Sequence, residues 1–179
     1  MTTKLEWLNS LPSELAAQEL LQCCGSQRWA QQMGEGRPYA SLETLIASAN
    51  DIWWSLAPDD WLEAFRSHPK IGEKKAATSV SVQSQKWSGQ EQAGVSNASQ
   101  DTVDSLATLN RAYEQKFGFI FIICATGKTS AEMLEALRER LENDVATELP
   151  IAAAEQSKIT ELRLKKLVSG PLSGTLSPT

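Results

Sequence analysis

Apolar residues recur at helical spacing along most of the chain. Ala17, Leu20, Leu21 and Cys24 stand at positions i, i+3, i+4 and i+7, which places them on one face of a helix over residues 12–24. A proline opens this stretch and a glycine follows it, and both are typical of those helix positions. The pattern predicts an amphipathic helix packed on a core.

Further helices are predicted from the same spacing and from residues that favour helix ends. A serine cap, a proline in the first turn, a glycine stop and a Thr-x-x-Glu capping box mark their boundaries. Their apolar stripes run through residues 42–53, 58–65, 103–117, 129–143 and 150–168. Helices are therefore expected to make up most of the structure.

One segment breaks the helical pattern. Residues 119–124 read Phe-Ile-Phe-Ile-Ile-Cys, a β-branched and aromatic run that is typical of extended chain. No second convincing strand is available to pair with it, so we interpret it as a buried extended connection or as the start of a helix. Residues 78–99 are polar and rich in Ser and Gln, which is typical of a linker, although Trp87 indicates that part of them packs against the body.

The predicted fold class is all-α, a single-domain helical bundle with a buried extended connection around residues 119–124. The domain is expected to span residues 1–168, with residues 169–179 as a flexible tail. A length of 179 residues suits one domain with a core of its own. No internal repeat or domain boundary interrupts the pattern.

Composition excludes several classes of protein. Apolar residues make up 41% and charged residues 22%, as in ordinary globular proteins, and 17 basic against 22 acidic side chains argue against a nucleic-acid partner. The apolar run of residues 119–125 is too short to cross a membrane, and the N-terminus lacks the apolar core of a signal peptide. Three cysteines without a framework indicate reduced thiols, so a cytoplasmic location is expected.

His68 is the only histidine of the chain. It precedes Pro69, which disfavours helical backbone at His68, so His68 is expected just past the end of a helix. Pro69 and Gly72 restrict the backbone path of this loop. A rigid loop that holds a side chain of near-neutral pKa suits a general acid or base, and the alternative is a structural or exposed histidine.

Two other positions are candidates for chemistry. Ser88 and Glu91 are three residues apart, which is typical of a capping box at a helix start, and such a cap would also hold Glu91 in place for acid–base work. Arg140 flanks an apolar stripe that includes Leu137 and Leu141. It belongs either to a solvated helix face or to a clamp for a planar anion.

The sequence lacks the common cofactor motifs. The run Thr-Gly-Lys-Thr at 126–129 is not a phosphate-binding loop, because the glycine that this motif requires upstream is replaced by Ile122. One histidine and three cysteines match no usual zinc spacing, and no glycine-rich dinucleotide fingerprint is present. No metal and no nucleotide cofactor are expected.

Five sequence pieces, in order, resemble the 2-oxo-4-hydroxy-4-carboxy-5-ureidoimidazoline (OHCU) decarboxylase family. They are His-Pro-Lys-Ile-Gly at 68–72, Ser-x-x-Glu-Gln at 88–92, Phe-Gly-Phe-Ile-Phe-Ile-Ile-Cys at 117–124, Arg-Leu-Glu-Asn at 140–143 and Glu-Leu-Arg-Leu at 161–164. The resemblance implies an all-helical homodimer that decarboxylates an unstable intermediate between uric acid and allantoin, giving the S form of allantoin.

The resemblance also implies a role for individual residues. It assigns His68 and Glu91 as the catalytic pair. It implies that the substrate is bound by Pro69, Ser88, Gln92, Phe119, Ile120, Phe121, Ile122, Ile123 and Arg140. The carboxylate that leaves stands next to a C=N bond, which takes up the electron pair, so the implied reaction needs no cofactor.

Two other functions stay open from the sequence. The chain could be a non-catalytic helical interaction module that uses its six tryptophans as anchors, and a large exposed apolar patch would then be expected. A hydrolase of a related ureide is the second alternative. That reaction requires an activated water, for which the sequence offers no nucleophile or metal motif.

Overall fold

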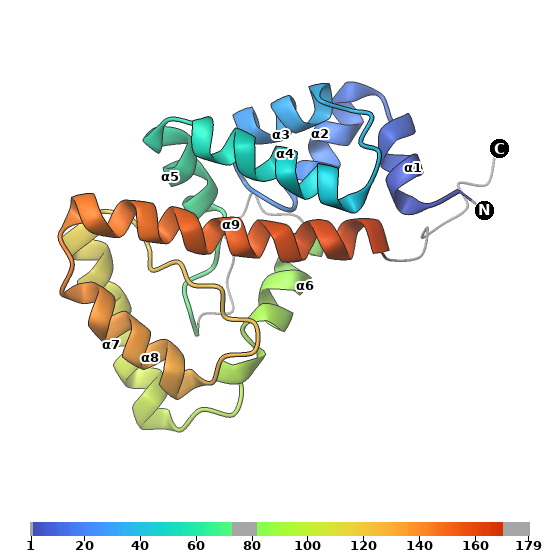
Figure 1. Ribbon diagram of the computed structural model, residues 1–179. Helices are drawn as coiled ribbons and strands as arrows, with labels where there is room; N and C mark the ends of the chain where they lie inside the picture. The colour runs from blue at the N-terminus through green and yellow to red at the C-terminus, as the bar shows by residue number, and fades with distance from the viewer. Residues whose placement is uncertain (1, 73–81, 170–179) are drawn as a thin grey trace.

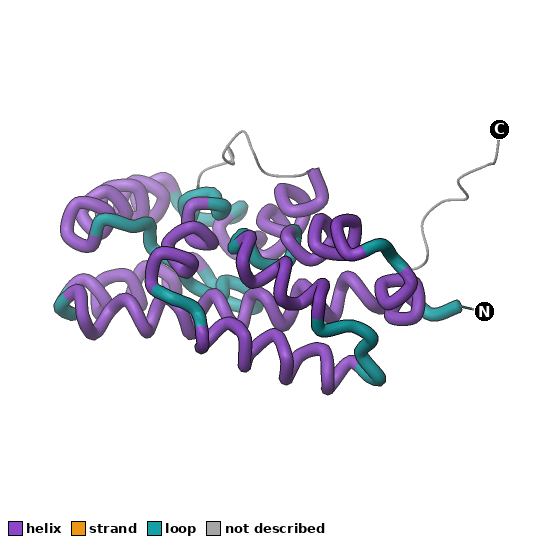
Figure 2. The backbone as a smooth tube through the Cα atoms, turned by 90° about the horizontal axis from the view of Figure 1, so that it is seen from above, coloured by secondary structure: helices purple, strands orange, loops and turns teal. Residues whose placement is uncertain are grey.

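The structure is a computed structural model that describes residues 2–72 and 82–169. Within these residues the chain forms nine α-helices, one short 3₁₀ turn (Ala93–Val95) and no strand (Figures 1 and 2). The all-α prediction is therefore confirmed. Residues 170–179, which include nearly all of the predicted tail, lie outside the described residues, as do residues 73–81.

One long helix divides the structure. In Figure 1, α9 (Val145–Ser169) crosses the middle of the molecule, with the first five helices on one side and the next three on the other. The first group is α1 (Lys4–Ser10), α2 (Ser13–Leu21), α3 (Gln27–Glu35), α4 (Leu42–Ser55) and α5 (Pro58–Arg66). The second group is α6 (Val82–Glu91), α7 (Gln100–Phe117) and α8 (Ser130–Leu141).

Several helix ends follow the caps that the sequence predicts. The Ser41 hydroxyl accepts the Thr44 N–H at the start of α4. Thr129 and Glu132 form the expected capping box at the start of α8. Gly118 ends α7 in the left-handed conformation with φ 78°, which glycine adopts without the steric cost of a side chain.

The last helix begins earlier than predicted. α9 starts at Val145 instead of Pro150, because Asp144 caps it by accepting the Thr147 N–H on its carboxylate at 2.7 Å. Pro150 therefore lies inside the helix, where its missing N–H removes one backbone hydrogen bond. The short helices α1 and α3 were not predicted either.

The polar stretch of residues 78–99 is partly helical. From residue 82 to residue 91 it forms α6, so the linker interpretation is wrong for these residues. Trp87 is buried, as expected. Residues 78–81 lie outside the described part of the chain.

Residues 119–125 run as a buried, irregular connection between α7 and α8, as expected. The alternative interpretation as a helix start is wrong, because α8 begins only at Ser130. Buried backbone groups need hydrogen-bond partners, and here helix side chains supply them. The Ile122 carbonyl accepts from Arg140 at 2.6 Å, and the Cys124 N–H donates to Glu155 at 2.8 Å.

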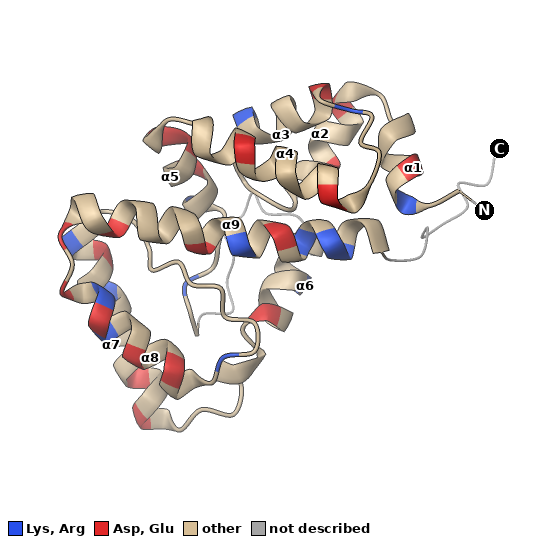
Figure 3. Ribbon diagram, viewed as in Figure 1, with Lys and Arg blue, Asp and Glu red and all other residues tan. Residues whose placement is uncertain are grey.

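Charged side chains are distributed over both halves of the molecule. Figure 3 shows acidic and basic positions interspersed along the helices. None of the described helices has both the length and the apolar character needed to span a membrane. The three cysteines, all within the described residues, are buried free thiols.

Candidate active site

Four segments that are distant in sequence meet at a small cavity of about 20 Å³. The loop after α5, the end of α6, the extended connection and α9 all contribute to it. Its polar lining comes from His68, Ser88, Glu91 and Gln92. Three of the five sequence pieces singled out above thus converge here.

A wider cavity of about 400 Å³ adjoins the first. Both are lined by Pro69, Ser88 and Gln92. Gln92 also fixes the loop that follows His68, because its side-chain oxygen accepts the Gly72 N–H at 3.1 Å. Gly72 has φ +85°, a conformation that residues with a side chain rarely adopt.

His68 lies just past the end of α5, as predicted, and is half-buried. Its Nε2 stands 2.6 Å from the side-chain oxygen of Gln156, a fully buried residue of α9. Burial and the nearby positive charge of Arg163 lower the pKa of His68 to about 3. The imidazole is therefore neutral near pH 7.

Glu91 is held by a forked ion pair. Arg163 Nε donates to one Glu91 oxygen at 2.8 Å, and Arg163 NH2 donates to the other at 3.0 Å. The same NH2 group donates to the Ser88 hydroxyl at 3.0 Å. All three side chains are buried, so this planar arrangement fixes the carboxylate firmly beside the cavity.

The capping-box interpretation of Ser88 and Glu91 is wrong. Both residues stand in the last turn of α6, whereas a capping box requires the first turn. The Ser88 hydroxyl faces Arg163 instead of the backbone of its own helix. Their spacing of three places both side chains on one helix face toward the cavity.

His68 and Glu91 border the same cavity but have separate partners. His68 bonds Gln156, and Glu91 bonds Arg163. Among the described residues no direct hydrogen bond joins the two. An imidazole and a carboxylate nevertheless line the same cavity.

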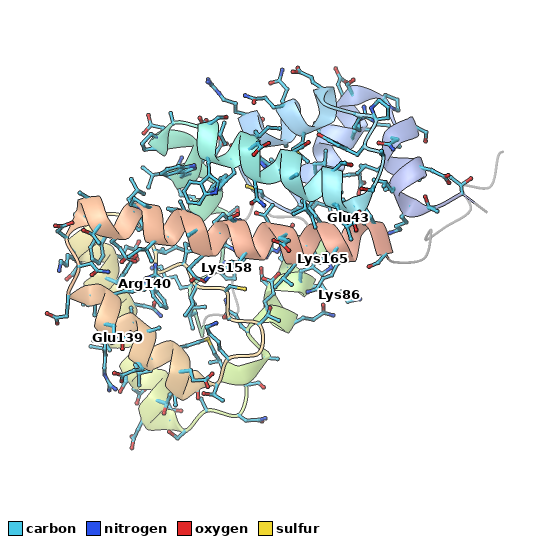
Figure 4. All side chains as sticks on the ribbon, viewed as in Figure 1. Glu43, Lys86, Glu139, Arg140, Lys158 and Lys165 are labelled. Atoms are coloured by element: carbon cyan, nitrogen blue, oxygen red, sulfur yellow. The ribbon has the colours of Figure 1, made fainter. Side chains whose placement is uncertain are left out.

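Arg140 lies behind the cavity wall. It projects between α8 and α9 (Figure 4), where its Nε donates to the fully buried Glu148 at 2.6 Å. Its NH1 donates to the carbonyl of Ile122, a residue that lines the cavity. Arg140 is not one of the described residues that line the cavity. It donates hydrogen bonds to Glu148, Tyr113 and the Ile122 carbonyl.

The predicted wall residues divide into two groups. Phe121, Ile122 and Ile123 line the cavity. Phe119 and Ile120 stand outside that lining in the described structure, and the Phe119 ring lies 5.5 Å from the ring of Phe65, within the core. The segment thus has one end in the core and the other at the cavity.

Sequence reasoning assigned no site role to Gln156 or Arg163, although Arg163 stands in the sequence piece at 161–164. They are seven positions apart on α9, so both point from the same helix face. Apart from Glu148 and Thr160, the buried part of that face is apolar and includes Ile159 and Leu167. Two polar residues within an apolar stripe are the signal that could have found them, since such residues are rarely buried without a partner.

The arrangement suits proton transfer to a small polar molecule. A neutral imidazole is a competent base, and a carboxylate, a hydroxyl and a carboxamide stand beside it. Across residues 2–72 and 82–169, no group of three His, Cys, Asp or Glu side chains is placed to hold a metal ion.

Comparison with known proteins gives a consistent result. A family model described as OHCU decarboxylase matches residues 9–165. The chain is 45% identical over 157 residues to the uric acid degradation bifunctional protein TTL of Arabidopsis thaliana, covering 87% of this chain and 48% of that protein. It is 31% identical over 140 residues to 2-oxo-4-hydroxy-4-carboxy-5-ureidoimidazoline decarboxylase of Amia calva, covering 78% of this chain and 79% of that protein.

The fold also matches a solved structure. A crystal structure of OHCU decarboxylase in the presence of (S)-allantoin superposes with a TM-score of 0.73 at 44% identity, covering 85% of this chain and 98% of the other. The bifunctional relatives are much longer than this chain. It spans about half of the Arabidopsis thaliana protein and 31% of the corresponding protein of Bacillus sp. (strain TB-90).

Proposed function

The chain belongs to the OHCU decarboxylase family, and we propose that it is a carboxy-lyase that converts OHCU to (S)-allantoin in urate breakdown. One observation carries this proposal. His68 and Glu91, from separate segments, border a single cavity, where Arg163 holds the carboxylate. An imidazole and a fixed carboxylate are groups that a decarboxylase needs to move protons on its substrate.

The substrate would occupy both adjoining cavities. A volume of about 20 Å³ accommodates roughly one water molecule, which is too little for a ureidoimidazoline. The neighbouring cavity of about 400 Å³ provides the remaining space. Pro69, Ser88 and Gln92, which line both, would then contact the substrate at its middle, while residues 121–123 form an apolar wall.

In the proposed reaction, neutral His68 accepts a proton from the substrate hydroxyl. The bond to the carboxylate breaks, carbon dioxide leaves, and the electron pair moves into the adjacent C=N bond, whose nitrogen takes up a proton from solvent. The proton held by His68 is then transferred to the ring carbon, directly or through Glu91, and the oxygen of the former hydroxyl becomes a carbonyl of allantoin. Orientation of this kind is worth roughly 7–11 kcal/mol, and a positioned acid–base group about 10²–10⁴-fold in rate.

In the proposed function, Arg140 acts indirectly, by positioning the cavity wall. Its bond to the Ile122 carbonyl sets where that residue stands beside the substrate. Direct contact between Arg140 and the substrate, which the family resemblance implies, stays a prediction. Contacts of Phe119 and Ile120 with the substrate also stay predictions.

A homodimer in the cytoplasm is part of the same proposal. Trp54 exposes 45% of its surface, which leaves an aromatic side chain available for a second copy. The free thiols of all three cysteines fit a reducing compartment. Light scattering at micromolar concentration is expected to give twice the mass of one chain, and a single-chain mass would remove the dimer from the proposal.

The function is tested with freshly made product of urate oxidation. We expect carbon dioxide release at a rate proportional to the concentration of protein, with circular dichroism reporting accumulation of (S)-allantoin. The matched control is His68→Asn, which keeps a polar side chain that can hydrogen-bond but removes the titrating ring. Decay of the substrate at its spontaneous rate in the presence of the wild-type protein would contradict the proposal.

A further inference from the structure

A chain of hydrogen bonds runs behind His68, away from the cavity. His68 Nε2 meets Gln156 Oε1 at 2.6 Å, and Gln156 Nε2 meets Thr160 Oγ1 at 3.1 Å. Gln156 is fully buried and Thr160 is nearly so, whereas His68 also lines the cavity.

The direction of this chain determines which His68 nitrogen carries the proton. The Gln156 amide nitrogen donates to the hydroxyl oxygen of Thr160. The amide oxygen of Gln156 therefore faces His68. An amide oxygen only accepts, so the hydrogen bond requires a proton on Nε2 of the ring.

We infer that Gln156 is a positioning residue that holds His68 as the neutral tautomer protonated at Nε2, so that Nδ1 is the nitrogen that exchanges protons with substrate. This inference rests on the proposed function for its last step, and the tautomer itself does not depend on that function. A neutral imidazole has one N–H, and the partner of that N–H sets the tautomer.

A neutral amide suits this task better than a carboxylate. The charged groups close to His68 are Arg163 from α9 and Glu91 from α6, and these two already pair with each other. Lys70, in the same loop as His68, pairs with Glu114 of α7 at 2.7 Å. Gln156 therefore orients the ring without adding a charge that would favour the imidazolium.

The uniqueness of His68 allows a direct test. Histidine labelled with ¹⁵N is incorporated into protein without an affinity tag, and long-range ¹H–¹⁵N correlation spectra are recorded near pH 7. Every imidazole signal then belongs to His68. We expect a pyrrole-type shift for Nε2 and a pyridine-type shift for Nδ1. The opposite assignment, or two nitrogens that share one averaged shift, would overturn the inference.

Variants separate positioning from packing. Gln156→Met fills the same space without an acceptor and is expected to average the two nitrogen shifts and to lower kcat by about 10²-fold with little change in KM. Gln156→Glu keeps an acceptor, so the Nε2–H tautomer is expected to persist while the added charge raises the pKa of His68. Unchanged shifts and kcat in Gln156→Met would also overturn the inference.

Thr160 offers a matched pair of variants. Thr160→Ser keeps the hydroxyl and is expected to retain the wild-type nitrogen shifts, whereas Thr160→Val removes it and frees the Gln156 amide to turn over. A Thr160→Val protein with unaltered shifts would contradict the proposed direction of the chain. The wild-type spectrum needs no variant, so a substitution that fails to fold does not remove the test.

Failure of the inference is distinguishable from failure of the proposed function. An active decarboxylase with His68 protonated at Nδ1 overturns the role of Gln156 and leaves the function standing. A protein with the expected tautomer but no decarboxylase activity overturns the function and the proton transfer at Nδ1, while the orientation of the ring by Gln156 stands.

Discussion

Arg163 and Glu91 join α9 to α6 through two parallel hydrogen bonds of 2.8 and 3.0 Å. Both side chains are buried, at 3% and 8% exposure, so each depends on the other for compensation of its charge. Arg163 also donates to the carbonyl of Gln22, which follows α2. One guanidinium thus connects the two halves of the molecule and fixes the carboxylate of the candidate active site.

Loss of Arg163 is expected to destabilise the fold. Arg163→Met should lower the free energy of unfolding by about 3–5 kcal/mol, because it leaves the Glu91 carboxylate buried without its partner. Arg138→Met is the matched control, since Arg138 is mostly exposed and should change stability by no more than about 0.5 kcal/mol. Urea denaturation monitored by circular dichroism measures both, and equal midpoints would contradict the prediction.

Removal of either proposed catalytic group should reduce turnover. His68→Asn and Glu91→Gln are each expected to lower kcat by about 10²-fold or more, which is the typical contribution of a positioned acid–base group. Glu91→Gln removes charge while keeping shape, so its effect on stability must be measured alongside. Wild-type turnover in His68→Asn would end the assignment of His68 as catalytic.

Stability should depend on pH through His68. Its pKa is lowered to about 3 in the folded protein, chiefly by burial, compared with 6.5 for an unperturbed histidine. Between these values the unfolded chain binds a proton that the folded chain does not, so stability rises with pH across this window. Unfolding free energies at pH 5 and pH 7 should differ more in the wild type than in His68→Asn. Equal differences would show that His68 titrates normally.

Substitution of Arg140 should lower activity by displacing the cavity wall. Arg140→Lys cannot reproduce the planar set of bonds to Glu148 and to the Ile122 carbonyl. We expect kcat/KM to fall by roughly 10- to 100-fold, because small misplacements of site groups are costly even from a distance. Arg138→Lys, on an exposed part of the same helix, should leave kcat/KM unchanged. Equal effects of the two substitutions would contradict a specific role for Arg140.

The proposed reaction should be stereospecific. The spontaneous reaction gives racemic allantoin, because water reaches both faces of the planar intermediate. A substrate held between His68 and the wall of residues 121–123 presents one face to one acid. In deuterium oxide we expect (S)-allantoin labelled at the newly protonated carbon, detected by circular dichroism and mass spectrometry. Racemic product at an accelerated rate would restrict the enzyme to the loss of carbon dioxide.

Local signals in the sequence predicted much of the fold. The capping box of Thr129 and Glu132 and the stop at Gly118 depend on interactions within a few residues, and both were found. Pro150 was misleading because a proline is typical of a first helical turn, whereas the cap at Asp144 sets the actual start. Local preference is decisive only where no stronger neighbouring signal competes with it.

The site was harder to predict because its geometry is tertiary. His68 and Glu91 were candidates from the sequence, and the structure brings both to one cavity, while their catalytic role stays a prediction. The partners of these residues, Gln156 and Arg163, come from α9 and lie 88 and 72 residues further along the chain. No spacing rule connects such distant positions. Arg140 shows the converse, since its motif was noticed but its place behind the wall depends on how α8 packs.

The backbone of the extended segment that forms the cavity wall is held by hydrogen bonds to helix side chains instead of by pairing with a neighbouring strand. Arg140 holds it at the Ile122 carbonyl, and Glu155 holds it at the Cys124 N–H. In a sheet, a shift of one strand moves every residue together. Here two separate side chains hold the segment, each through its own hydrogen bond. Glu155→Asp shortens one of these side chains by a methylene and so offers a way to change the shape of the wall locally. The pocket is therefore adjustable from positions outside its own lining, which makes this segment a natural target for redesign of substrate selectivity.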